Sequence, residues 1–146
     1  MRTDPHGHSL PEWLIFACGV WLVGLALYFI FVRPALLPED LRYIGFDPQA
    51  LASAAPNLGG WLGSVFTVMG GFMAGAGVLV MHFGLRVMPA RIAATGLVLA
   101  VAGTSTVGLM SAVNFALHSE FRWVLVVPPI VWAIALVMYS RLRMQR

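Results

Sequence analysis

The sequence has no lysine, a single cysteine and few charged residues of any kind. Only 10% of the 146 residues are charged, whereas 60% are aliphatic, aromatic, Met or Cys. A soluble domain carries about 25% charged residues, so this chain cannot surround a core with a water-facing shell. Disorder is excluded too, because it requires low hydrophobicity and high net charge. The composition therefore excludes a soluble globular enzyme and predicts a small polytopic membrane protein.

The lone cysteine and the missing lysines exclude two further classes. Cys18 cannot form a disulfide within the chain, which excludes the thiol–disulfide chemistry of four-helix membrane oxidoreductases with paired cysteines. The basic residues are all arginines, and they lie at the ends of apolar runs. This placement is typical of anchors at a membrane surface rather than of a phosphate-binding face. We expect a lipid bilayer around the chain and no nucleic-acid partner.

Four apolar stretches are long enough to cross a bilayer, which takes roughly 20 helical residues. We expect these spans at residues 13–32, 58–83, 92–117 and 123–139. The segment 84–91 is short and contains Pro89, so the second and third spans should form a helical hairpin. The predicted fold is all-α, with four transmembrane helices in an antiparallel bundle. It makes one membrane domain over residues 1–146.

The external loop at 34–57 is expected to be helical in part. Residues 38–45 begin with a proline and two acids and end on a glycine, which is typical of a short helix. Asp47 is expected to be the N-cap of a second short helix that ends before Pro56. The apolar residues of both helices favour a position at the membrane interface, as a lid over the bundle.

Arginine counts predict the orientation. With both termini on one side, the short segments there hold six arginines, and the opposite side holds Arg33, Arg42 and Arg122. An excess of positive charge keeps short segments in the cytoplasm. We therefore expect both termini and the second loop to be cytoplasmic. The six cytoplasmic arginines are Arg2, Arg86, Arg91, Arg141, Arg143 and Arg146.

Small residues line one predicted face of the second span and an answering face of the third. Helices in lipid associate by close backbone approach over such faces. We expect these two faces to pack, mostly within one chain, with packing between chains as the alternative. Leucine at Gly71 or Gly75 should hold the backbones apart and so prevent a folded bundle or its assembly. The predicted packing residues are Gly59, Gly63, Thr67, Gly71 and Gly75 on the second span, and Gly96, Ala100 and Gly103 on the third.

The third span carries a polar stripe made of Thr104, Ser111, Asn114 and His118. At 100° per residue these side chains share a sector of about 80°, and polar groups that face lipid are costly. The stripe should therefore face into the bundle. Two interpretations remain open. One is hydrogen bonding to a neighbouring helix, such as the fourth span with its free carbonyls, and the other is a polar cleft that opens outward and binds a small ligand.

No metal or cofactor is expected. His118, Glu120, Glu39 and Asp40 face the same side, but no pair among them has a helix-face ligand spacing. A b-type haem needs histidines at matching depth on facing helices. His82 is expected near the inner end of its span, whereas His118 is near the outer end of the next, so the two cannot ligate one iron.

The loop that follows the first span contains Arg33-Pro34, Leu37-Pro38-Glu39-Asp40-Leu41 and Tyr43-Ile44-Gly45. Together with the hydropathy pattern, these motifs resemble a loop in small uncharacterised bacterial integral membrane proteins with four predicted spans. The resemblance implies a protein of the bacterial inner (cytoplasmic) membrane. It implies no activity, cofactor or site residue.

The spans contain no Asp, Glu, Lys or Arg in their interiors, which argues against a proton-coupled small multidrug carrier. Three functions remain. The favoured one is a non-enzymatic subunit that assembles with itself or with a larger membrane complex. The alternative is a binding or permeation protein for a small apolar or amphipathic molecule. The third is an enzyme acting on lipid or isoprenoid head groups through His118, Asn114 and an external carboxylate.

Overall fold

A computed structural model describes residues 8–144, apart from the side chain of Arg143. The described residues form helices joined by turns, and four helices are long and apolar enough to cross a membrane. The all-helical class and the four predicted spans are therefore confirmed. The first span is α1 (Leu10–Phe31), whose first turn is closed by Glu12: its carboxylate accepts a hydrogen bond from the backbone N–H of Ser9 at 2.7 Å.

The remaining helices follow in chain order, and several spans are built from more than one helical segment. The loop holds α2 (Pro38–Ile44) and α3 (Pro48–Ala54). The second span joins α4 (Leu58–His82) to a π-helical turn, η1 (Phe83–Val87). The third joins α5 (Thr95–Gly103), a π-helical turn η2 (Thr104–Gly108) and α6 (Leu109–Ala116), and the fourth joins α7 (Arg122–Leu125) to α8 (Val127–Met144).

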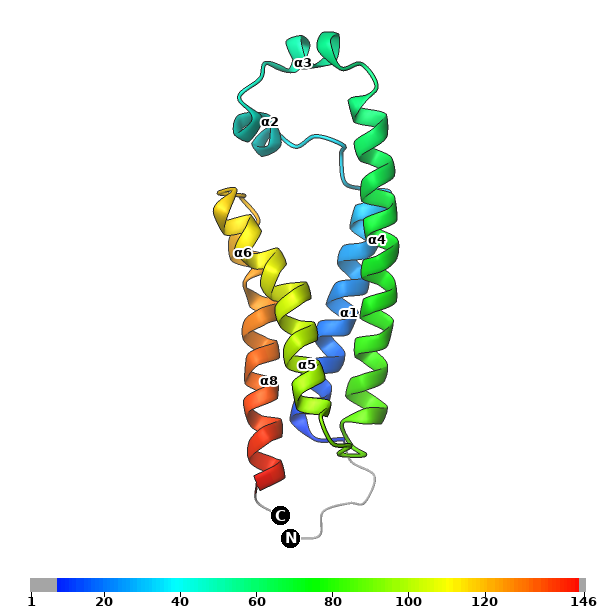
Figure 1. The fold of residues 1–146 in the computed structure, drawn as a ribbon, viewed down its shortest axis with the longest axis vertical. Helices are drawn as coiled ribbons and strands as arrows, with labels where there is room; N and C mark the ends of the chain where they lie inside the picture. Colours follow the sequence, from blue (N-terminus) through cyan, green and yellow to red (C-terminus); the bar gives the residue numbers. More distant parts are fainter. Residues whose placement is uncertain (1–7, 145–146) are drawn as a thin grey trace.

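The helices pack in two pairs that meet along α1. α1 lies against α4 over most of its length and also contacts α8, whereas α5 packs on α8. Figure 1 shows α4 and the third span close together at the turn between them and apart at the opposite end. The two spans are consecutive, but they do not pack along their length as the predicted hairpin implies. The helix also continues through η1 to Val87, where the sequence predicted a turn from residue 84.

Glycines bring α1 and α4 into backbone contact. A Cβ atom on Gly77 would lie 2.8 Å from the carbonyl oxygen of Gly19, and one on Gly19 would lie 2.7 Å from that of Gly77. The same contact recurs every seven residues. Gly70, seven residues before Gly77, meets Ala26, seven residues after Gly19, and Gly84, seven residues after Gly77, meets Glu12, seven residues before Gly19. Contacts every seven residues keep one face of each helix toward its partner. Only glycine fits at these α4 and η1 positions.

The second pair is joined by a buried tryptophan. Trp132 of α8 is 2% exposed, and its indole N–H donates to the carbonyl oxygen of Leu99 on α5 at 2.9 Å. The ring lies where a Cβ atom on Gly103 would stand, 2.7 Å from the Trp132 Cδ1 atom. Gly103 is thus a packing residue as predicted, but its partner is α8 rather than the second span.

The other predicted packing glycines do not bring helices together within the chain. Cβ atoms on Gly59, Gly63, Gly71 and Gly75 of α4, or on Gly96 of α5, would meet no atom of another segment within 4 Å. Thr67 is exposed and its hydroxyl donates to the carbonyl of Gly63 in its own helix, and Ala100 is half-buried. The expected packing between these faces is therefore not found within the described chain. The rows face away because α1, not the third span, is the main partner of α4.

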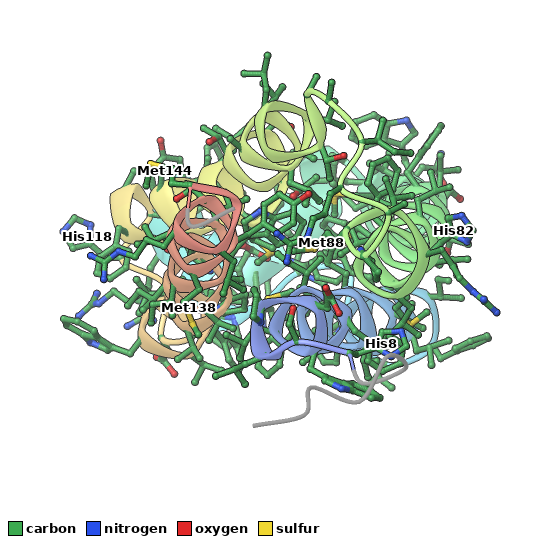
Figure 2. The ribbon with its side chains drawn as sticks, turned by 90° about the horizontal axis from the view of Figure 1, so that it is seen from below. His8, His82, Met88, His118, Met138 and Met144 are labelled. Atoms are coloured by element: carbon green, nitrogen blue, oxygen red, sulfur yellow. The ribbon has the colours of Figure 1, made fainter. Side chains whose placement is uncertain are left out.

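The described end of the bundle near the termini is closed by the turn between η1 and α5. Met88 in this turn is fully buried and lies centrally among the helix ends in Figure 2. The Tyr139 hydroxyl of α8 donates to the Met88 carbonyl oxygen at 3.5 Å, and the Arg91 guanidinium donates to the Leu142 carbonyl at 3.0 Å.

Candidate functional site: a cavity beneath the α2 lid

A large cavity lies between α1, α4 and the η2–α6 part of the third span, and α2 borders its outer end. Its volume is about 1160 Å³, at or above the usual range of about 300–1,000 Å³ for small-molecule sites. It lies where the α1–α4 pair and the third span diverge in Figure 1. The divergence therefore creates a space large enough for an extended molecule.

The walls of the cavity are mostly apolar and flexible or aromatic. From α4, residues at helical spacing face it, with Phe66 and Met73 among them. Unbranched methionine side chains adapt to irregular surfaces, and aromatic rings provide large apolar area. Such walls suit a hydrocarbon chain better than a polar solute. The principal apolar lining residues are Trp21, Leu25, Phe29, Leu62, Phe66, Met69, Met73, Leu109, Met110 and Val113.

The outer end of the cavity contains a partly buried ion pair. The Arg33 guanidinium donates to the Asp40 carboxylate at 3.1 Å, and the two side chains are 10% and 28% exposed. The guanidinium also lies over the Phe66 ring, 3.7 Å from its centroid, a geometry typical of a cation–π contact. The same Asp40 oxygen accepts from the Leu37 N–H and closes the first turn of α2. Arg33 thus ties the end of α1 to both α4 and α2.

Two further contacts connect α2 to the turn between α6 and α7. The Ser119 hydroxyl donates to the Glu39 carboxylate at 2.9 Å, and Ser119 is buried. The Arg42 guanidinium donates to the Glu120 carboxylate at 2.9 Å, but this pair is largely exposed. Together with the Arg33–Asp40 pair, these contacts hold α2 across the outer end of the cavity, from α1 to the third span.

The hydroxyl groups of η2 bond back to their own helix. Ser105 donates to the carbonyl of Val101 at 2.8 Å, and Thr106 donates to that of Ala102 at 2.6 Å. Both residues line the cavity. Their hydrogen-bonding capacity is therefore partly satisfied, and they present a weakly polar wall. Such π-helical turns are frequent at functional sites.

The structure separates the four residues of the predicted polar stripe. Asn114 lines the cavity and donates to the Met110 carbonyl of its own helix at 2.9 Å. Thr104 is exposed and bonds the Ala100 carbonyl, and Ser111 is 6% exposed but is not a cavity residue. His118 lies at the periphery of the bundle in Figure 2, with a left-handed φ of 51°, away from the cavity lining. One predicted ligand-binding residue out of the stripe thus belongs to the site, and the bonds of Thr104 and Asn114 run within their own helix rather than to a neighbour.

Sequence reasoning missed most of the lining. In the sequence, Arg33 indicates topology and the acids Glu39 and Asp40 are typical of the start of a helix, although Asp40 both caps α2 and pairs with Arg33. Ser105 and Thr106 lie outside the sector that defined the stripe, because successive side chains of a helix are about 100° apart and these two follow Thr104 directly. A signal was present in the sequence: bulky residues of α4 recur at helical spacing opposite the Gly71 and Gly75 face.

The histidines do not converge. His82 and His118 lie on opposite sides of the bundle in Figure 2. Within residues 8–144, no group of three or more His, Cys, Asp or Glu side chains is arranged to hold a metal ion. The polar groups of the cavity include one ion pair, the Glu39 carboxylate with its hydrogen-bonded Ser119 hydroxyl, and the Asn114 amide.

Comparison of the chain with family models, with curated proteins and with solved structures finds no match in any of the three.

Proposed function

We propose that this chain is a small multi-pass membrane protein that binds one apolar or amphipathic molecule in the cavity beneath α2. The observation that carries the proposal is the cavity itself, with a volume of about 1160 Å³ and mostly apolar walls. Ligand sites combine such walls with a few polar groups that fix orientation. Here the polar groups gather at one end, around Arg33, Asp40 and Glu39, which matches an amphiphile lying along the helices.

The geometry favours binding over the enzymatic alternative. An enzyme that used His118 with Asn114 would need both side chains at one substrate, but only Asn114 lines the cavity. The position of α2 supports a role as a lid, because it is held to α1 through Asp40 and to the turn after α6 through Glu39. A molecule that enters from the lipid between α4 and α6 would need no movement of the tight α1–α4 contact.

We further propose that the four spans form an antiparallel bundle in the inner membrane of a bacterium, with both termini in the cytoplasm. The arginine excess near the termini and the second loop supports this orientation. Arg2 and Arg146, which contribute to that excess, lie outside the described residues. The cavity and the helical loop then face the extracytoplasmic side. Reporter fusions to both ends should report a cytoplasmic location for each, and opposite locations would contradict the orientation.

The binding proposal is tested by native mass spectrometry of the full chain extracted in mild detergent. We expect a stoichiometric apolar or amphipathic adduct. Ala76→Phe should displace most of it, because Ala76 lines the cavity and a phenyl ring would fill part of the space. Val78→Phe is the matched control: Val78 is 55% exposed and does not line the cavity. Equal adduct occupancy in both variants would contradict the proposal.

A second function is favoured by one observation on α4. The row of Thr67, Gly71 and Gly75 is exposed and has no partner segment within the described chain. Rows of small residues on membrane helices permit close helix–helix contact. We propose that this row serves assembly with a second copy or with a larger membrane complex. Gly71→Leu should then reduce the assembled mass and leave the monomer folded, whereas an unchanged mass distribution would count against assembly through this face.

A further inference from the structure

The net charge at one end of the cavity indicates which class of head group it binds. This inference rests on the proposed binding function. Three charged side chains line the cavity: Arg33, Glu39 and Asp40. Arg33 and Asp40 are paired at 3.1 Å, so their charges largely compensate each other. The Arg33 guanidinium is further occupied by the Phe66 ring and by a hydrogen bond to the Pro34 carbonyl at 2.9 Å.

Glu39 is left without a compensating charge. Its carboxylate accepts a hydrogen bond from the Ser119 hydroxyl, which is neutral. Among residues 8–144, leaving aside the Arg143 side chain, no basic group lies within 4.0 Å of it, since the ion pairs found there are Arg33–Asp40 and Arg42–Glu120. The charged groups that line the cavity therefore add up to one negative charge.

Two tyrosine rings line the cavity together with Glu39: Tyr28 of α1 and Tyr43 of α2. The faces of aromatic rings attract organic cations, and ammonium groups above all. A sulfate or carboxylate head would instead face an uncompensated carboxylate next to an arginine that already has a partner. The rings and the carboxylate thus favour the same sign of ligand charge.

We propose that the cavity takes an amphiphile with a cationic amine or ammonium head, placed beside Glu39 beneath α2, and a hydrocarbon chain between α4 and α6. The chain contacts Met69, Met73 and Met110, whose side chains adapt to different chain shapes. The head remains at the outer end, where the carboxylate stays hydrated in part, so no charge has to enter the apolar middle of the bundle.

The test compares three probes with the same decyl chain: decyltrimethylammonium, decanol and decyl sulfate. Each is added to the full chain in phosphatidylcholine nanodiscs, and the stoichiometric adduct is quantified by native mass spectrometry. We expect the cation to bind roughly tenfold more tightly than the alcohol, a difference of the size that one ion–aromatic or ion–ion contact supplies. Decyl sulfate should bind most weakly. Equal occupancy by all three, or tightest binding of the sulfate, overturns the head-group assignment.

Two variants locate the effect. Glu39→Gln keeps an acceptor for Ser119 but removes the charge, so the preference for the cation over the alcohol should fall to near unity while the alcohol still binds. Glu120→Gln is the matched control, because it removes the same charge from the neighbouring turn outside the cavity lining. If Glu120→Gln abolishes the preference equally, surface charge explains it and the assignment is wrong. If no probe binds, or if Ala76→Phe leaves decanol binding unchanged, the cavity itself is not the site and the proposed function fails.

Discussion

The helix α4 has two rows of glycine, and the two rows behave in opposite ways. Gly70 and Gly77, with Gly84 one step further in η1, meet the backbone of α1, whereas Gly71 and Gly75 meet no other segment. Both rows consist of the same residue on one apolar helix. The difference is therefore one of partner and spacing. The contacting row repeats every seven residues and is matched by a seven-residue series on α1, whereas the other row repeats every four and has no matching series in contact.

The largest expected effect comes from a substitution in the contacting row. Gly77→Leu would place a Cβ atom 2.8 Å from the Gly19 carbonyl oxygen and the rest of the side chain against Val23. Two of the three nearest atoms, the Gly19 carbonyl oxygen and the Val23 amide nitrogen, belong to the backbone and cannot rotate away, so α1 and α4 must separate. We expect a loss of about 3 kcal/mol or more in the free energy of unfolding, at the upper end of overpacking effects. Unfolding in mixed micelles with increasing SDS measures it.

Gly71→Leu is the control on the same helix. Its side chain would extend into space that is open within the chain, and leucine has a better helix propensity than glycine, so monomer stability should stay within about 1 kcal/mol of the original. The sequence predicts that leucine at Gly71 prevents either the folding of the bundle or its assembly, and the open space around Gly71 leaves assembly as the expected effect. If Gly71→Leu unfolds the monomer and Gly77→Leu does not, the assignment of the two rows is wrong.

The sequence predicted the number of spans well and their partners poorly, for one physical reason. Span length and hydrophobicity depend on each helix alone, so α1 could be recognised without its neighbours. Partner choice depends on which face meets which, and α4 is apolar on every side, so polarity does not select a face. The face of α4 that contains Gly77 packs on α1 because its glycines match the positions of Glu12, Gly19 and Ala26 on α1.

The cavity was harder still to predict, because it depends on helices that diverge. Its volume exists because α4 follows α1 while the third span follows α8, and no local pattern in either span encodes that separation. The polar stripe pointed to the correct helix, and Asn114 does line the cavity. Asn114 is at the edge of the face that lines the cavity, and Ser105 and Thr106 of η2 are on that face whereas Thr104 is not.

A smaller effect is expected at the contact between α5 and α8. Trp132→Phe keeps a bulky ring beside Gly103 but removes the N–H that donates to the Leu99 carbonyl at 2.9 Å. Losing this buried hydrogen bond should cost about 0.5–1.5 kcal/mol, the net contribution of a typical intramolecular hydrogen bond. The same SDS titration measures the loss, and tryptophan fluorescence should report less emission from a buried ring. Trp123→Phe is the control, since Trp123 is 65% exposed. Equal losses of stability in both variants would show that the hydrogen bond from Trp132 to Leu99 does not cause the effect.

The smallest effect is expected where α2 meets solvent. Arg42 and Glu120 are 2.9 Å apart, but their side chains are 64% and 70% exposed, and water screens such pairs strongly. Arg42→Gln should therefore change the free energy of unfolding by no more than about 0.5 kcal/mol. Because the buried Ser119 still holds Glu39, ligand retention should also be unaffected. The free energy of unfolding and the retained adduct are measured for Arg42→Gln and for Ser119→Ala, which removes the Glu39 contact from the same turn. If Arg42→Gln releases the adduct and Ser119→Ala does not, the lid is held by its exposed ion pair rather than by its buried hydroxyl.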